Sequence, residues 1–322
     1  MTFINVRKAR PTPGDVHVNA PLTNVAVAWW QTQTNYIADA IFPIVPVAKQ
    51  SDLYYKWSKE ELLRDEAQPR APGTESAGGR FAVQTDSYSA KVEAFHKDID
   101  DQLRENADSV LSLDASATRF VAQKLLTRRE STFFSKFFTT GVWATDASPS
   151  TKWDQASSTP RSDVDAGKLK IQETTGFTPN VLVLGPYVLR ALRANAEVRD
   201  QFKYTSADSI DTAMLARFFG VDRVVVPTAI QTTTKEGAAT QTTSFFAGKH
   251  ALLLYSAPAP SIMEPSAGYI FNWSGNTGAL AGMRIKRFRM EALASDRIEG
   301  EMAYDFKVVA NELGYMMNAA VS

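Results

Sequence analysis

The segment DASATRFVAQKLLTRRESTFFSKFF, residues 114–138, predicts the longest helix of the chain. Asp114 can cap its start, and Gly141 follows it as a stop signal. At about 100° per residue, its apolar side chains fall on two nearly opposite faces. One face carries Ala117, Val121 and Leu125, and the other carries Leu126, Phe133 and Phe137. Such a helix is either buried on both faces in one large core, or it is a spine helix that packs against its own domain on one face. In the second case, other parts of the chain or another subunit cover the second face.

A charged stretch precedes this helix. Residues 56–80, KWSKEELLRDEAQPRAPGTESAGGR, are dense in both charge signs and then in Pro and Gly, so they cannot bury a core of their own. The flanks, residues 52–57 and 81–92, are strand-like, which indicates a projecting hairpin. A solvated face of mixed charge is the plainest interpretation. The alternative is a salt-bridge surface against another subunit, formed by Lys59, Glu60, Glu61, Arg64, Asp65, Glu66, Arg70 and Arg80.

Residues 1–47 have the composition of an arm. Prolines recur along these residues, and because proline has no backbone N–H they disfavour the regular hydrogen bonds of a helix or sheet. The segment FPIVPV at residues 42–47 is compatible only with an edge strand. Trp29 and Trp30 would therefore need apolar surface from another part of the molecule or from another copy. The alternative is an N-terminal strand and helix of an ordinary domain.

After the long helix, residues 144–163 are rich in Ser, Thr, Asp and Pro and indicate a loop. A buried strand is then predicted at residues 181–184, followed by a helix with Pro186 in its first turn. A second helix ends at Gly220 and leads into a strand at residues 221–226. This is a strand, helix, helix, strand unit.

From Met283 the pattern alternates and predicts two long strands with a turn near residues 295–300. With both helices and strands along the chain, we expect an α+β fold.

Composition limits the function. The 322 residues include 35 basic and 35 acidic side chains, so no net charge draws the protein to nucleic acid or to an anionic membrane. The absence of cysteine excludes disulfides, thiolate metal sites and cysteine nucleophiles. No stretch approaches the roughly 18 continuous apolar residues of a membrane helix, and the N-terminus lacks the apolar core of a signal peptide.

Each candidate catalytic motif is incomplete. The histidines His17, His96 and His250 are too scattered for a metal site or a triad. His96, Asp98 and Asp100 would share one face of a strand, but a solvated stretch before a helix explains them as well. Gly248-Lys249 lacks the rest of a phosphate-binding loop, and Glu264 replaces the glycine that a nucleophile elbow at Ser266 requires. We expect no enzyme, no cofactor and no metal.

Taken in order, several stretches resemble the major capsid proteins of tailed bacteriophages, which share the Hong Kong 97 fold. They are IADAIFPIVPVAKQSDLYYKW, YSAKVEAFHKDIDDQLRENAD, the helix through RRESTFFSKFF, TPNVLVLGPYVLRALRANAEVRDQFKY and ARFFGVDRVVVPTA. The resemblance covers nearly the whole chain. It implies an N-terminal arm at 1–47, an extended loop at 48–94, a peripheral domain with a spine helix at 95–164, an axial domain at 165–282 and return strands of the peripheral domain at 283–322.

The resemblance also implies a function. Subunits would assemble in the bacterial host cytoplasm into the hexamers and pentamers of an icosahedral or prolate phage head. That head would enclose double-stranded DNA without sequence-specific binding. Contacts between subunits are expected at Trp29, Trp30, the charged residues of the loop, and the outer helix face with Phe133 and Phe137.

The implied partners are further copies of the chain, a portal protein, a candidate decoration protein and a separate scaffolding protein. The scaffold is implied because the arm is short and a start at Met1 argues against cleavage. Two alternatives remain: a nanocompartment shell of the same fold that encloses protein cargo, and a soluble α/β enzyme.

Overall fold

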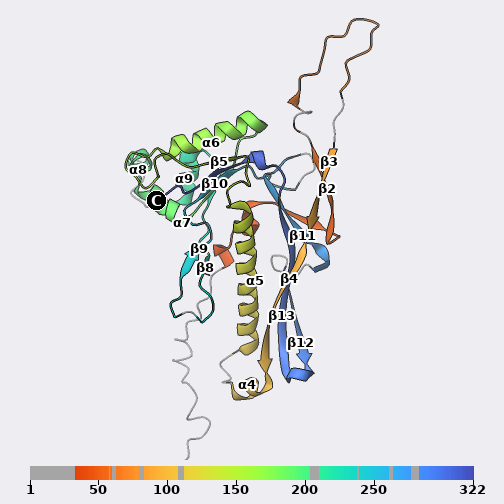
Figure 1. The fold of residues 1–322 in the computed structure, drawn as a ribbon, viewed down its shortest axis with the longest axis vertical. Coiled ribbons are helices and arrows are strands. Elements are labelled where there is room, and N and C mark those ends of the chain that lie inside the picture. Colours follow the sequence, from red (N-terminus) through yellow and green to blue (C-terminus); the bar gives the residue numbers. More distant parts are fainter. Residues whose placement is uncertain are drawn as a thin grey trace, which may run out of the picture.

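The molecule has two limbs, one built on a long sheet and one on a helix-covered sheet (Figure 1). The computed structural model describes residues 33–57, 59, 63–79, 83–107, 112–203, 210–237, 239–260, 264–276 and 283–322. Trp29, Trp30, Glu60, Glu61 and Arg80 lie outside these residues. Helix α5 (Leu113–Phe137) runs along the long limb, as the sequence predicts.

The sheet of the long limb is organised around β13 (Ser295–Val308). On one side, β12 (Met283–Met290) pairs with the first part of β13 and β11 (Gly268–Trp273) pairs with its last part. On the other side, β13 pairs with β4 (Lys91–Asp100). The parallel edge strand β1 (Ile44–Val47) extends it beyond β11, which agrees with the edge position expected from its prolines. A short helix α4 (Asp101–Asn106) follows β4 at the far end of the limb.

Gly300, in the middle of β13, is where α5 lies against this sheet. A Cβ there would come within 2.6 Å of Val121 Cγ1 and 2.7 Å of Leu125 Cδ1, so only glycine allows the helix this close. The predicted turn at residues 295–300 is therefore wrong. The chain reverses earlier, through the short turn Glu291–Leu293 and Ala294, whose φ is 43°.

Helix α5 departs from prediction in two details. Ser112, not Asp114, precedes the helix, and Asp114 lies in its first turn. Its two predicted apolar faces are both covered within the subunit, because the buried stripe winds around the helix from Ala117 towards Phe137. Phe133 and Phe137 are 0% exposed and pack against Phe42.

The outer helix face that we expected to contact other subunits therefore does not include Phe133 and Phe137. Both rings also contact Phe306 of β13, so this chain itself supplies their surroundings.

The second limb contains the predicted strand, helix, helix, strand unit. β6 (Val181–Leu184) is fully buried, and β7 (Arg223–Val225) pairs parallel to it. Between them lie α7 (Pro186–Ala194), α8 (Ala196–Phe202) and α9 (Thr212–Phe219). Asn195 divides the first predicted helix in two, because its side chain accepts a bond from Glu197 N and starts α8. Gly220 ends α9 with a φ of 58°.

Strands from three distant parts of the chain complete this sheet. β10 (Ala251–Leu254) pairs with β6, and β14 (Gly314–Met317) joins β10 to β5 (Thr145–Ala147). Helix α6 (Pro160–Thr175) lies above it (Figure 1). The chain therefore crosses between the limbs once more than the sequence indicated, and it returns to the long sheet earlier. β11, inside the range 165–282, lies in the long sheet, and β14, inside 283–322, lies in the second one.

Two hairpins complete the fold. β2 (Ser51–Trp57) and β3 (Val83–Ser89) pair antiparallel in register from Ser51 with Ser89 to Trp57 with Val83. β8 (Ile230–Thr232) pairs with β9 (Thr243–Phe245) in a smaller one. Short 3-10 turns are found at Gln33–Asn35, Ser274–Asn276 and Asn311–Leu313, and a single helical turn, α2, at Ala38–Ile41.

Candidate functional site: the two projecting ends

The residues considered for catalysis are engaged in structural bonds. Asp98 accepts two hydrogen bonds from Arg297, at 2.7 and 2.9 Å. Ser266 is fully buried and donates to Gly268 O at 3.1 Å, and His250 Nδ1 accepts from Ala319 N at 3.2 Å. Among the described residues no His, Asp and Glu side chains group as metal ligands, and no helix there is long and apolar enough to cross a membrane.

The β2–β3 hairpin is anchored at its base on the long sheet. Tyr88 stacks on Phe271 with ring centroids 4.6 Å apart, and Tyr54 lies 5.3 Å from the same ring. Asp305 of β13 accepts from Ser89 N at 3.0 Å and from Lys136 Nζ of α5 at 2.8 Å. These contacts bury one face of the hairpin at its root.

The other face of the hairpin carries apolar side chains that nothing in the described chain covers. Side chains alternate across a strand, so Leu53 and Tyr55 point away from Tyr54. They are 63% and 67% exposed, and Val83 on β3 is 42% exposed. We name Leu53, Tyr55 and Val83 the outer hairpin face. Sequence reasoning concentrated on the charged residues beyond the hairpin and missed it, although the alternation in SDLYYKW carries the signal.

The charged residues of the loop are spread out. Lys59 Nζ bonds Glu312 Oε1 at 2.6 Å and so meets its own subunit. Arg64 pairs with Glu66 at 3.2 Å, and the Arg70 side chain donates to Thr74 O. Asp65 is exposed. The structure therefore brings the described loop charges into local pairs, and it does not gather them into one cluster.

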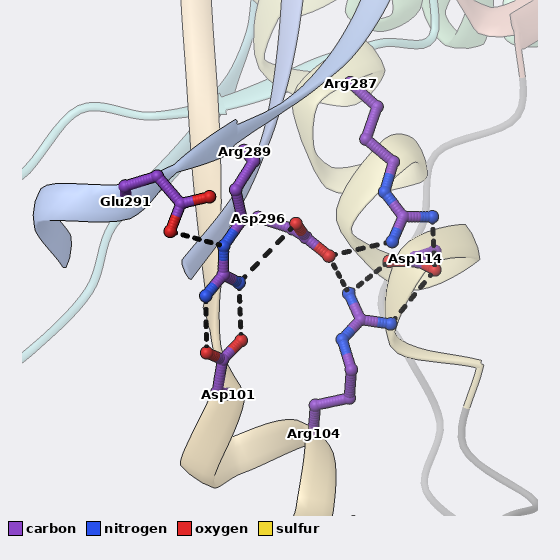
Figure 2. A network of polar contacts seen from close by, with 7 residues as sticks. All are labelled: Asp101, Arg104, Asp114, Arg287, Arg289, Glu291 and Asp296. Atoms are coloured by element: carbon purple, nitrogen blue, oxygen red, sulfur yellow. Dashed lines mark hydrogen bonds and ion pairs between the residues drawn. The ribbon is translucent and has the colours of Figure 1, made fainter. Parts of the chain in front are cut away.

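A denser set of charges lies at the opposite end of the molecule, where β12 turns into β13 beside α4 (Figures 1 and 2). Arg289 binds Asp101 through two bonds of 2.6 Å each. Arg104 bridges Asp114 at 3.0 Å and Asp296 at 3.1 Å. Arg287 forms further ion pairs with Asp114 and Asp296, and Glu291 forms one with Arg289 (Figure 2). We name these seven residues the tip network: Asp101, Arg104, Asp114, Arg287, Arg289, Glu291 and Asp296.

The tip network changes the acidity of its members. Hydrogen bonds that arginines donate lower the pKa of Asp101, Asp114 and Asp296, and the bonds that Arg289 donates to Asp101 raise the pKa of Arg289. The three carboxylates therefore stay ionised at lower pH than free aspartates do, and their ion pairs connect the end of the sheet with α4. Sequence reasoning missed it, because its members come from four separate segments.

Comparison with known proteins fits this architecture. Residues 127–262 match the family model described as phage major capsid protein E. A curated major capsid protein of Burkholderia phage BcepMu is 23% identical over 295 residues, which are 87% of this chain and 91% of that protein.

Solved structures show the same fold. A phage-related protein of Bordetella bronchiseptica aligns with a TM-score of 0.68 and 23% identity, covering 90% of this chain and 93% of that one. The capsid of cyanophage P-SCSP1u aligns with a TM-score of 0.61 and 10% identity, covering 96% and 94%. The chain therefore has the fold of phage capsid proteins of the Hong Kong 97 type. The chain is thus similar to phage major capsid proteins, to the family model over residues 127–262 and to the Burkholderia phage protein over most of its length.

Proposed function

We propose that the chain is a phage major capsid protein, that its subunits form the hexamers and pentamers of a closed icosahedral or prolate head, and that the outer hairpin face binds a neighbouring subunit. The observation that carries this proposal is the exposure of Leu53 and Tyr55 on a hairpin that extends past the body (Figure 1). Exposed apolar side chains gain free energy when a partner covers them, at about 25 cal/mol per Å². A symmetric shell repeats that gain at every copy.

The ranges implied by the family resemblance serve this function as follows. Residues 1–47 act as an arm and 48–94 as a loop that both reach other subunits, with Trp29 and Trp30 as apolar anchors. Residues 95–164 and the strands from Met283, without β5 and β14, form the peripheral part together with β11, and the rest of 165–282 lies around the fivefold and sixfold centres. The loop charges, among them Glu60, Glu61 and Arg80, set the register between copies.

The head encloses double-stranded DNA without recognising its sequence. The chain has equal numbers of basic and acidic residues, 35 of each, so counterion release does not hold the DNA to the wall. A separate scaffolding protein, a portal protein and a decoration protein are the further partners that we propose.

The test replaces Leu53 and Tyr55 with Glu in one variant. The control, Gln84→Glu, places one such charge on the opposite face of the same hairpin. We expect electron microscopy to show shells from the wild type and the control, expressed with the neighbouring phage gene products. The double variant should stay an unassembled subunit with unchanged circular dichroism. Shells of normal yield from the double variant would contradict the proposed contact.

A further inference from the structure

Glu130, in the C-terminal half of α5, is a buried carboxylate that binds backbone. It is 1% exposed. Ile37 N donates to both of its oxygens, at 3.0 and 3.2 Å, and Ala38 N donates to Oε2 at 3.0 Å. These two amides belong to the segment that connects the N-terminal residues to the body. A carboxylate that accepts three such bonds fixes the path of that segment strongly.

Two further residues of α5 hold the same segment. Tyr36 OH accepts from Gln123 Nε2 at 2.6 Å. Arg129 is 2% exposed, forms an ion pair with Asp39 and stacks its guanidinium 4.9 Å above the Tyr304 ring. Side chains of α5 therefore clamp residues 36–39 on both sides of the Glu130 bonds.

The chain after this segment is fixed as well. Ile41 O accepts from Ser256 Oγ at 2.6 Å and from Arg223 Nη2 at 3.2 Å, both in the second limb. Phe42 packs between rings of α5. Residues 36–42 thus tie α5 to the second limb, and we name them the root of the proposed arm.

We propose that Glu130 is a positioning residue for assembly, which anchors the root of the N-terminal arm on α5 and sets the point where the arm leaves the subunit. The consequence for assembly rests on the proposed role of the arm, whereas the anchoring itself does not. The arm then starts from the same place in every copy, so its reach to a neighbour is repeated with little loss of conformational entropy.

The anchor is also sensitive to protons. Burial raises the pKa of Glu130 to about 7, against the opposing effect of the Ile37 and Ala38 amides and Arg129. Burial raises the pKa of Asp39 too, and Tyr36 and Tyr304 are the other titratable groups that face the site. Glu130 and Asp39 share one buried cation, the guanidinium of Arg129, so one of the two negative charges is not compensated. A proton on either acid removes that charge. The anchor weakens as the pH rises through 7, because docking of the segment favours the protonated acid.

The test measures hydrogen exchange and proteolysis in the full-length, unassembled subunit. Glu130→Ala should make the Ile37 and Ala38 amides exchange at least about tenfold faster. It should also open the Tyr36–Ile37 bond to chymotrypsin, while exchange in the middle of α5 is retained. The matched control is Glu173→Ala, an exposed glutamate on α6. Unchanged exchange and cleavage in Glu130→Ala would overturn the proposal.

Glu130→Gln keeps the shape of the side chain and tests the same idea if the Ala variant does not fold. In the wild type, protection of the Ile37 and Ala38 amides should fall between pH 5.5 and pH 8.5, after correction for intrinsic exchange. In the Gln variant it should not change. Identical pH profiles would overturn the proton-sensitive part of the proposal.

Shell yield, measured by electron microscopy, separates the anchor from the function of the arm. A freed anchor should reduce the yield of closed shells in Glu130→Ala and not in Glu173→Ala. Normal shells with a freed anchor would overturn its role in assembly. If even the wild type formed no shells with its neighbouring gene products, the proposed function would fail, and the exchange result would still decide the anchor.

Discussion

Gly314 lies where the end of α5 meets the second sheet, and its replacement by Ala should be costly. A Cβ at this position would overlap the six-membered ring of Trp143. That ring cannot give way easily, because its Nε1 donates to Phe137 O at 2.8 Å and the side chain is 4% exposed. The backbone is not the obstacle, since Gly314 has an ordinary extended conformation, with φ at −129°.

The magnitude follows from two opposing effects. Overpacking of a rigid core site costs about 1–3 kcal/mol and sometimes more. The Ala substitution also removes freedom from the unfolded chain, which stabilises the fold by about 0.4–1 kcal/mol. Because the Trp143 ring is fixed by a hydrogen bond, we take the upper part of the first range. Gly314→Ala should lower the free energy of unfolding by about 2 kcal/mol.

Urea unfolding of the unassembled subunit measures the loss in free energy of unfolding. A double-mutant cycle then tests whether this loss comes from the contact with the Trp143 ring. In a Trp143→Leu background the ring is gone and only the effect on the unfolded chain remains. Gly314→Ala should then stabilise the fold by about 0.4–1 kcal/mol, and the coupling should be about 2.5–3 kcal/mol in size. Gly78→Ala is the control, because a Cβ there meets no atom within 4 Å. Equal cost of Gly314→Ala in both backgrounds, or no cost in either, would refute the reasoning.

Three further predictions concern buried and exposed groups. Phe133→Ala should lower the free energy of unfolding by about 3–5 kcal/mol in urea titrations, since a fully buried ring leaves a cavity. Arg289→Ala should raise the pKa of Asp101 towards 3.8 in carboxyl NMR titrations, because it removes the bonds that lower it; an unchanged pKa would contradict the tip network. Burial raises the pKa of Glu130 from 4.5 to about 7. Protonated Glu130 therefore stabilises the fold fully below pH 4.5, by about 3 kcal/mol at most. This stabilisation is lost as the pH rises through 7. Unfolding free energies of wild type and Glu130→Gln, compared across this range, should diverge accordingly, and parallel curves would contradict it.

Elements with strong local signals could be predicted from the sequence. The run Val181–Leu184, with Pro186 after it, marks β6 and the start of α7 through apolar content and the fixed φ of proline. Gly220 marks the end of α9 because the left-handed conformation favours glycine. In each case the physical cause lies within a few residues of the signal.

The errors arose where the cause is remote in sequence. Gly300 was interpreted as part of a turn, yet it stands in mid-strand because α5 needs its missing side chain. The actual turn uses Ala294, which gives no turn signal. Phe133 and Phe137 were placed on an outer face, because periodicity shows that a side chain is apolar and not which surface covers it.

The same distinction holds for the candidate site. The charged loop could be recognised from composition, but its described charges pair locally, as Arg64 does with Glu66. The tip network could not be recognised, because Asp101 and Arg289 are 188 residues apart and meet only through the pairing of β4 and β12 with β13. Long-range strand register decides which charges become neighbours, and the sequence pattern does not reveal it.

The crossings of the chain between the two limbs bear on how a shell can be built. Three segments link one limb to the other: residues 36–42, β11 and β14. Trp143 adds a further link, because its ring packs on Gly314 of β14 and its Nε1 donates to Phe137 O at the end of α5. Such links make relative motion of the limbs costly, since several buried contacts would break together. The outer hairpin face and the tip network then keep a fixed separation at opposite ends of the molecule (Figure 1). The proposed closed shell needs such a rigid subunit, because the contact of the outer hairpin face with a neighbour must repeat after every symmetry operation.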